Sequence, residues 1–150
     1  MEWTSLLSTT AGALIALVAS TSTERRRWKR ELGQRTRDDR RAAYVAFLNA
    51  TADASEILIS IARGHDRDDT ALSRAGTVLR DSGVLPRRLE LSLVADDHVV
   101  RQATLTVTTL RAYRDTVTRG LTSESEELQH ARTAFNEQRD RLTQQMRGTL

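Results

Sequence analysis

Cysteine is absent from this chain of 150 residues, which excludes a disulfide framework, a thiolate zinc site and a cysteine nucleophile. Proline occurs once, glycine seven times, and aromatic residues make up only 4% of the chain. Residues that break helices or favour strands are therefore scarce, whereas alanine, leucine and arginine are abundant. The composition predicts an all-α fold, and the length allows one domain with a modest core.

Charge is missing from residues 3–23, which include the most apolar run of the chain. As a helix, these 21 residues would be about 31 Å long, close to the thickness of a bilayer's hydrocarbon core. The strongly apolar side chains are Leu6, Leu7, Leu14, Ile15, Leu17 and Val18. They contribute only about −2 to −4 kcal/mol to insertion. We therefore predict a marginal transmembrane anchor over residues 1–23, and the alternative is an amphipathic or buried helix that packs on the rest of the chain.

Positive charge is concentrated directly after this run. Residues 24–41 hold nine basic and four acidic side chains, a local charge of +5, so a total of +3 leaves −2 for the rest. The positive-inside rule then places the N-terminus outside and the C-terminal body in the cytoplasm. A cleaved secretory signal would instead carry its basic residues before the apolar run, where only Glu2 is charged.

Five cations follow the apolar run most closely, and they are Arg25, Arg26, Arg27, Lys29 and Arg30. At the inner leaflet they are expected to contact anionic lipid and to fix the orientation of the anchor. The alternative is that residues 25–41 bind the phosphates of a nucleic acid.

A stripe of core-facing residues predicts a helix from about Thr36 to Arg63. Its members recur at three- and four-residue steps: Tyr44, Phe47, Leu48, Thr51, Ala54, Leu58 and Ile61. Gly33 precedes the stripe, but one glycine costs a helix only about 1 kcal/mol, so this helix is compatible with one that continues from the anchor. The predicted organisation is an anchor (1–23), a basic juxtamembrane helix (24–41) and a cytoplasmic helical bundle (42–150).

Two short elements are expected next. The loop GHDRDDT precedes a helix that Asp69 or Thr70 caps and Gly83 stops. After Pro86, leucine alternates with polar residues as it would in a strand, at Leu89, Leu91 and Leu93. No second strand is evident as a partner, so we predict a helix here.

Two longer helices complete the predicted antiparallel bundle. The first begins at Asp96 or Asp97 and stops at Gly120, and the second begins at Ser123, which forms a capping box with Glu126. The last helix has apolar residues one heptad apart, at Leu128, Phe135 and Leu142. Packing within the chain is the favoured interpretation of this seam, and a coiled-coil dimer is the alternative.

Motifs for chemistry are lacking. His65, His98 and His130 are spaced too widely to share a helix face, and the aspartates of the first loop lack the later residues of a calcium loop. No phosphate-binding glycine loop or nucleophile elbow is present. We predict no catalytic residue, no metal and no cofactor. Small residues recur at Ser8, Gly12 and Ala16, a spacing that lets transmembrane helices pair closely.

The order of these features resembles a known kind of protein. A tryptophan and weak apolar run are followed by an arginine-rich stretch, a helix starting RRAAYVAFL and a last helix containing ARTAFNEQRDRL. This order resembles small actinobacterial membrane-anchored helical proteins of unknown function, some of which are described as plasmid-transfer or spread accessory proteins. The resemblance implies the anchored topology and no particular activity. We expect the bundle to contact another protein or a second copy of itself.

Overall fold

The computed structural model describes residues 34–64 and 68–150, which form helices and turns and contain no strand. The chain divides into two units, Met1–Asp38 and Asp39–Leu150, and the bundle is the second unit. The all-α prediction is confirmed. The described helices are Gln34–Arg63, α2 (Asp69–Asp81), α3 (Val84–Val94), α4 (Asp97–Thr118) and α5 (Glu126–Arg147).

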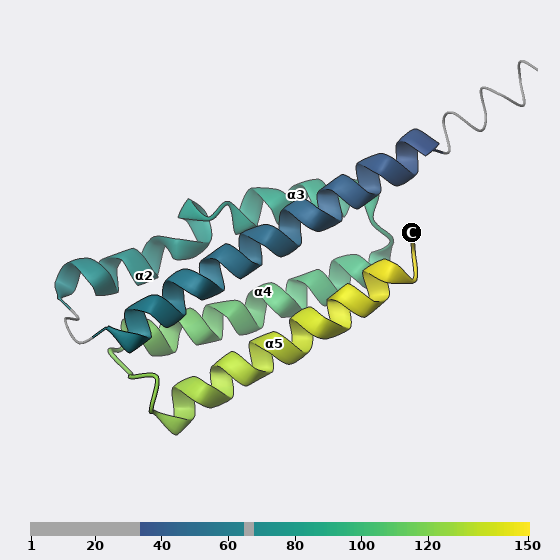
Figure 1. Ribbon diagram of the computed structural model, residues 1–150. Helices are drawn as coiled ribbons and strands as arrows, with labels where there is room; N and C mark the ends of the chain where they lie inside the picture. Colours follow the sequence, from purple (N-terminus) through teal and green to yellow (C-terminus); the bar gives the residue numbers. More distant parts are fainter. Residues whose placement is uncertain (1–33, 65–67) are drawn as a thin grey trace, which may run out of the picture. The chain divides into compact units, whose positions relative to one another are not determined.

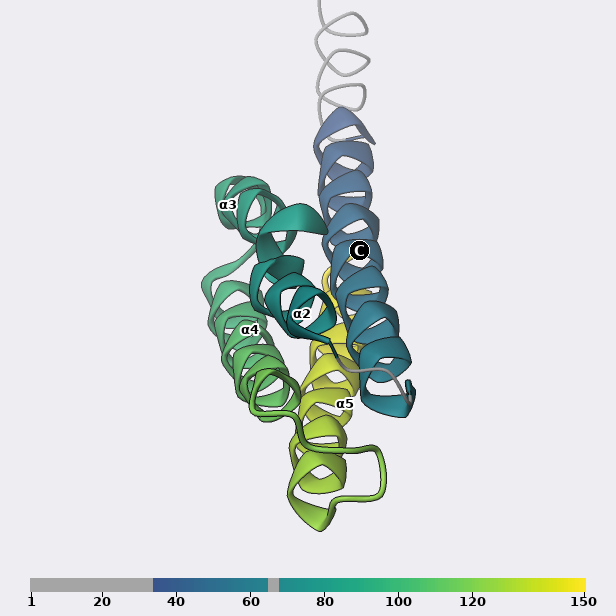
Figure 2. The same cartoon turned by 90° about the vertical axis from the view of Figure 1, so that its left-hand side faces the viewer.

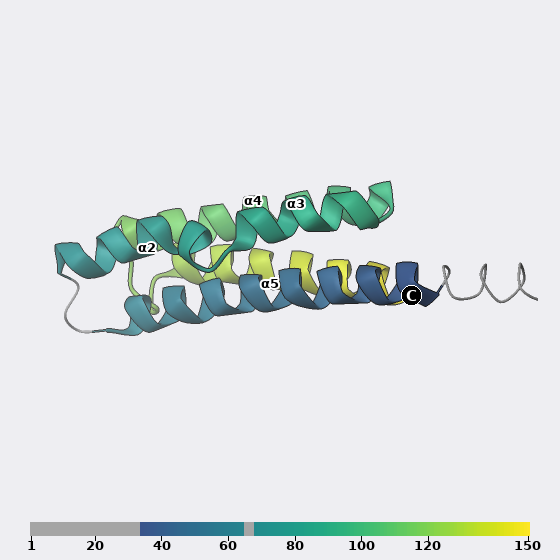
Figure 3. The ribbon, with the colours of Figure 1, turned by 90° about the horizontal axis from the view of Figure 1, so that it is seen from above.

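Successive helices of the Asp39–Leu150 unit run back and forth along the bundle (Figure 1). Helices α2 and α3 follow one another along one edge and together take the place of a single helix (Figures 1 and 3). Both contact α4, and the pairing of α4 with α5 is the most extensive among α2 to α5 (Figure 2). The predicted antiparallel bundle is therefore confirmed.

The helix Gln34–Arg63 supplies one side of the core. Of its predicted stripe, only Leu48 is partly exposed, and it packs against the core, while the other members are buried. By length and composition, this helix could cross a membrane, but half of its apolar window is buried inside the bundle. Core helices of soluble proteins have the same composition, so packing in the bundle already accounts for the apolar character of this helix.

The α5 seam is buried as predicted for packing within the chain. Leu128, Phe135 and Leu142 belong to the same core cluster as Phe47 and Leu110. These five residues share one core because each lies on the apolar stripe of its own helix. The residues at heptad spacing therefore pack within the chain.

A polar layer joins α4 to α5 within this core. The Gln102 side-chain amide donates to Gln138 Oε1 at 2.8 Å and to the Gln138 carbonyl at 3.2 Å. The Thr106 hydroxyl lies 3.0 Å from the Gln102 carbonyl and 3.3 Å from that of Gln138. Since buried polar groups are costly when unpaired, these bonds fix how the two helices face each other.

The start of α2 differs from the prediction by one residue. Asp68 is the cap, because its carboxylate accepts a hydrogen bond from the Ala71 backbone N–H at 2.8 Å. Asp69, one of the two predicted caps, lies in the first helical turn instead. The predicted stop is correct, since Gly83 has a φ of +71°, a left-handed conformation that glycine adopts readily.

The predicted capping box of the last helix is wrong. Helix α5 begins at Glu126 after Ser125, so Ser123 lies outside it. The Ser123 backbone N–H donates instead to the Ala62 carbonyl at 3.1 Å. This bond ties the α4–α5 loop to the helix Gln34–Arg63, a tertiary contact that outweighs the local capping pattern.

Candidate interaction surface

The predicted anchor and lipid-contacting cations lie outside residues 34–64 and 68–150, which the structure describes. They are Leu6, Leu7, Leu14, Ile15, Leu17, Val18, Arg25, Arg26, Arg27, Lys29 and Arg30.

Arg40, near the end of the predicted basic segment, is used inside the bundle. Its guanidinium donates to the carbonyls of Val94 (3.0 Å) and Thr149 (3.3 Å) and pairs with the Asp96 carboxylate at 3.4 Å. The Tyr44 hydroxyl bonds to that of Thr149 at 2.9 Å. Arg40 thus joins the end of α3, the start of α4 and the C-terminal segment, so it is not free to bind phosphates or lipid.

Helix α3 carries apolar residues on two opposite faces. Val84 and Leu91 are fully buried and hold the helix on the core. On the other face, Leu85, Leu89 and Leu93 are 37%, 66% and 79% exposed. A spacing of four places these three in one row along the helix. We call these three residues the α3 leucine row.

Polar groups border the α3 leucine row. At 100° per residue, Arg88 and Ser92 lie on one flank of the row and Glu90 lies on the other. Arg87 pairs with Glu90 at 2.7 Å, while Arg88 Nε is buried and has no hydrogen-bond partner in the structure. The row therefore has a cation along one side and a carboxylate along the other.

Backbone features hold α3 in place at both ends. The left-handed Gly83 redirects the chain from α2 into α3, and Pro86 falls in the first turn, where a missing N–H is harmless. At the other end, the Ala95 N–H donates to the Leu91 carbonyl at 2.9 Å. The α3 leucine row is thus presented by a helix whose course is well defined.

Sequence reasoning identified α3 but not its exposed row. The alternating leucines are compatible with a strand or a helix, and the prediction of a helix is confirmed. The missed signal is that a helix over these residues must have leucine at 85, 89 and 93 and apolar residues at 84 and 91 on opposite sides. Two apolar faces on one short helix indicate that one of them faces outward.

The structure brings no metal-ligating cluster together among its described residues. His98 and His130 are exposed, and His65 lies outside the described part of the chain. The α3 leucine row therefore stands out as a surface for packing, not for chemistry.

No family model, curated protein or solved structure matches the chain.

Proposed function

We propose that this protein is a membrane-anchored, non-catalytic helical interaction module that pairs with a second copy of itself through α3. The observation that carries the proposal is the α3 leucine row, which the bundle leaves uncovered. Rows of exposed apolar residues on a helix are typical of helix-to-helix docking. The resemblance to small actinobacterial anchored proteins is consistent with an accessory role of this kind.

Charge complementarity favours a second copy of the chain as the partner and a parallel direction of pairing. In a parallel pair of α3 helices, the flank of one helix that holds Arg88 meets the flank of the other that holds Glu90. Arg88 of each copy would then face Glu90 of the other. In an antiparallel pair, each flank meets its own kind, so arginine faces arginine and glutamate faces glutamate. The parallel arrangement is therefore favoured.

A common membrane supports the same arrangement. Both copies would be anchored through residues 1–23 from one side, so their α3 helices would point the same way. Three leucine side chains cover far less than the about 800 Å² per partner of a stable interface, so pairing is weak in dilute solution. Anchoring raises the effective concentration towards millimolar values and makes such weak pairing effective.

Cysteine crosslinking tests this pairing, because the natural chain contains no cysteine. Leu93→Cys is made in the full-length protein, and membranes are treated with a mild oxidant. A disulfide requires Cα atoms about 4.4–6.8 Å apart, which a parallel pair provides between the two copies of residue 93. Leu105→Cys is the matched control, since Leu105 is also exposed, at 52%, but lies on α4. We expect a disulfide-linked dimer for Leu93→Cys and none for Leu105→Cys.

Two results would overturn the pairing. If Leu93→Cys forms no dimer alone but crosslinks to a chain carrying Leu85→Cys, the helices are antiparallel. If neither combination crosslinks and lipid shields Leu93→Cys from a water-soluble maleimide, the row contacts the membrane surface instead.

The anchor is tested separately by extracting membranes with alkaline carbonate. Leu14→Asp combined with Ile15→Asp should release the protein, since each central carboxylate costs about 2.5–3.5 kcal/mol. An unchanged membrane fraction would show that residues 1–23 are not the anchor. A reporter fused at Leu150 should behave as cytoplasmic, and an extracytoplasmic signal would contradict the proposed orientation.

A further inference from the structure

A polar groove lies between the C-terminal half of the helix Gln34–Arg63 and the N-terminal half of α5, beside the α4–α5 loop. Its volume of about 430 Å³ falls within the range of small-ligand sites. The polar residues that line it are Arg63, Ser123, Gln129, Arg132, Thr133 and Asn136, and they include no carboxylate. The groove thus offers hydrogen-bond donors and two positive charges.

Neither arginine of the groove has a polar partner among the described residues. In the part of the chain that the structure describes, the side chains of Arg63 and Arg132 make no ion pair or hydrogen bond. Arginine guanidinium groups that converge without a carboxylate repel each other, so an anion between them is favourable.

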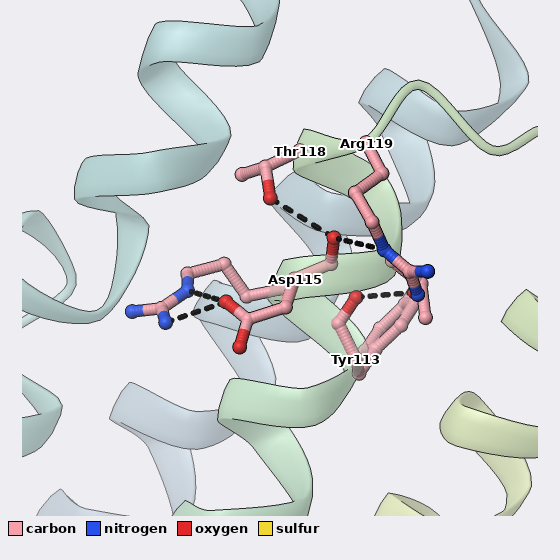
Figure 4. A network of polar contacts seen from close by, with 6 residues as sticks. Tyr113, Asp115, Thr118 and Arg119 are labelled. Carbon is pink, nitrogen blue, oxygen red and sulfur yellow. Dashed lines mark hydrogen bonds and ion pairs between the residues drawn. The ribbon is translucent and has the colours of Figure 1, made fainter.

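A second groove, between α4 and α5, differs because its arginine already has a carboxylate partner. Its volume is about 520 Å³, and its arginine, Arg119, already pairs with Glu127. Arg119 Nε also donates to the Asp115 carbonyl, which in addition accepts from the Thr118 hydroxyl (Figure 4). The positive charge there is neutralised, so this groove has no comparable attraction for an anion.

A buried tyrosine lies within electrostatic reach of the two arginines. Tyr113 of α4 is fully buried, and its hydroxyl has no hydrogen-bond partner in the structure. Burial raises the pKa of Tyr113, while the charges of Arg132 and Arg63 oppose the increase and that of Glu56 adds to it. The phenol is therefore neutral, and Tyr113 is not one of the residues that line the groove.

The charges around the hydroxyl sum to a positive value. Of the charges that act on the Tyr113 pKa, two are the arginines Arg132 and Arg63 and one is the carboxylate of Glu56. A phosphoryl group fits this setting, since it is a dianion with several oxygens that accept from guanidinium, amide and hydroxyl donors at once.

We infer that this groove binds a phosphoryl group, with Arg63 and Arg132 as its main contacts and the Asn136 amide as a further donor. The site is independent of the α3 leucine row, because its lining comes from α5, the α4–α5 loop and the helix Gln34–Arg63.

Calorimetric titration of the full-length protein in mild detergent at low salt tests this site. The probes are inorganic phosphate and a nucleoside monophosphate, with acetate as the competing carboxylate. Arg63→Gln and Arg132→Gln should each weaken phosphate binding about tenfold or more, because a hydrogen-bonded charge pair is lost. The matched control is Arg101→Gln on α4, whose exposed arginine lies outside the groove and makes no ion pair in the described chain.

Tyr113→Phe is a second control. Its hydroxyl has no protein partner and does not line the groove, so the melting temperature should be unchanged or raised and phosphate binding should be unchanged. Tighter binding of the nucleoside monophosphate than of phosphate would identify a phosphate ester as the ligand, and equal binding would identify free phosphate. The inference is overturned if phosphate does not bind, if acetate binds equally well, or if Arg101→Gln weakens binding as much as the groove variants.

Discussion

Two apolar rows of this protein have the same kind of sequence pattern, but one is buried and the other is exposed. The row of α5, Leu128, Phe135 and Leu142, is buried in the core that α4 and the helix Gln34–Arg63 share. The α3 leucine row faces away from that core. Helical spacing thus shows that residues share a face, but it does not show what covers that face.

The difference arises from the place of each helix in the bundle. Helix α5 is long and lies against α4 over much of its length, so its apolar row is enclosed. Helix α3 is 11 residues long, and its inner residues already fill the space available on the core side. Its outer row is therefore left uncovered by the bundle.

The largest expected effect is on the α5 row. Phe135→Ala removes a fully buried ring, so it should lower the free energy of unfolding by about 3–5 kcal/mol. Thermal unfolding of the full-length protein, followed by circular dichroism, measures this change. An unchanged melting curve would show that the α5 row does not support the bundle.

Leu91→Ala tests the inner face of α3 on the helix that also carries the exposed row. Because Leu91 is fully buried, we expect a loss of about 2–5 kcal/mol in the free energy of unfolding. A loss as small as that of an exposed leucine would mean that α3 is held loosely and that its two faces are not distinct.

Gln102→Ala tests the polar layer that sets how α5 faces α4. Removing this amide leaves the half-buried Gln138 side chain without its partner, so unfolding should become easier by about 1–3 kcal/mol. Gln144→Ala, at an exposed position of α5, is the control and should have little effect. Equal effects of the two variants in chemical denaturation would contradict the structural role of the layer.

Leu89→Ala should have the smallest effect on stability, within about 0.5 kcal/mol, because the side chain is largely exposed. The same change should nevertheless reduce the crosslinking of Leu93→Cys, because it removes the middle of the α3 leucine row. Normal crosslinking in the double variant would show that the α3 leucine row is not the pairing surface.

Much of the fold could be predicted because its signals are local. The stripe from Tyr44 to Ile61 and the glycines at 83 and 120 act within a few turns of helix, and the structure confirms them. The start of the last helix could not be predicted, because a backbone bond from Ser123 to distant Ala62 overrides the local capping pattern. The role of Arg40 was hidden for the same reason, since its partners are contributed by distant parts of the chain.

The sequence by itself determined the all-α class, the helical stripes and the separation of an uncharged N-terminal run from a basic segment, because composition and periodicity act through neighbouring residues. Only the tertiary structure decided that one leucine row is covered and the other exposed. It also placed Arg63 and Arg132, far apart in the sequence, on one groove with no carboxylate in its lining. Such juxtapositions depend on how whole helices pack, and packing is set by contacts between residues distant in the chain.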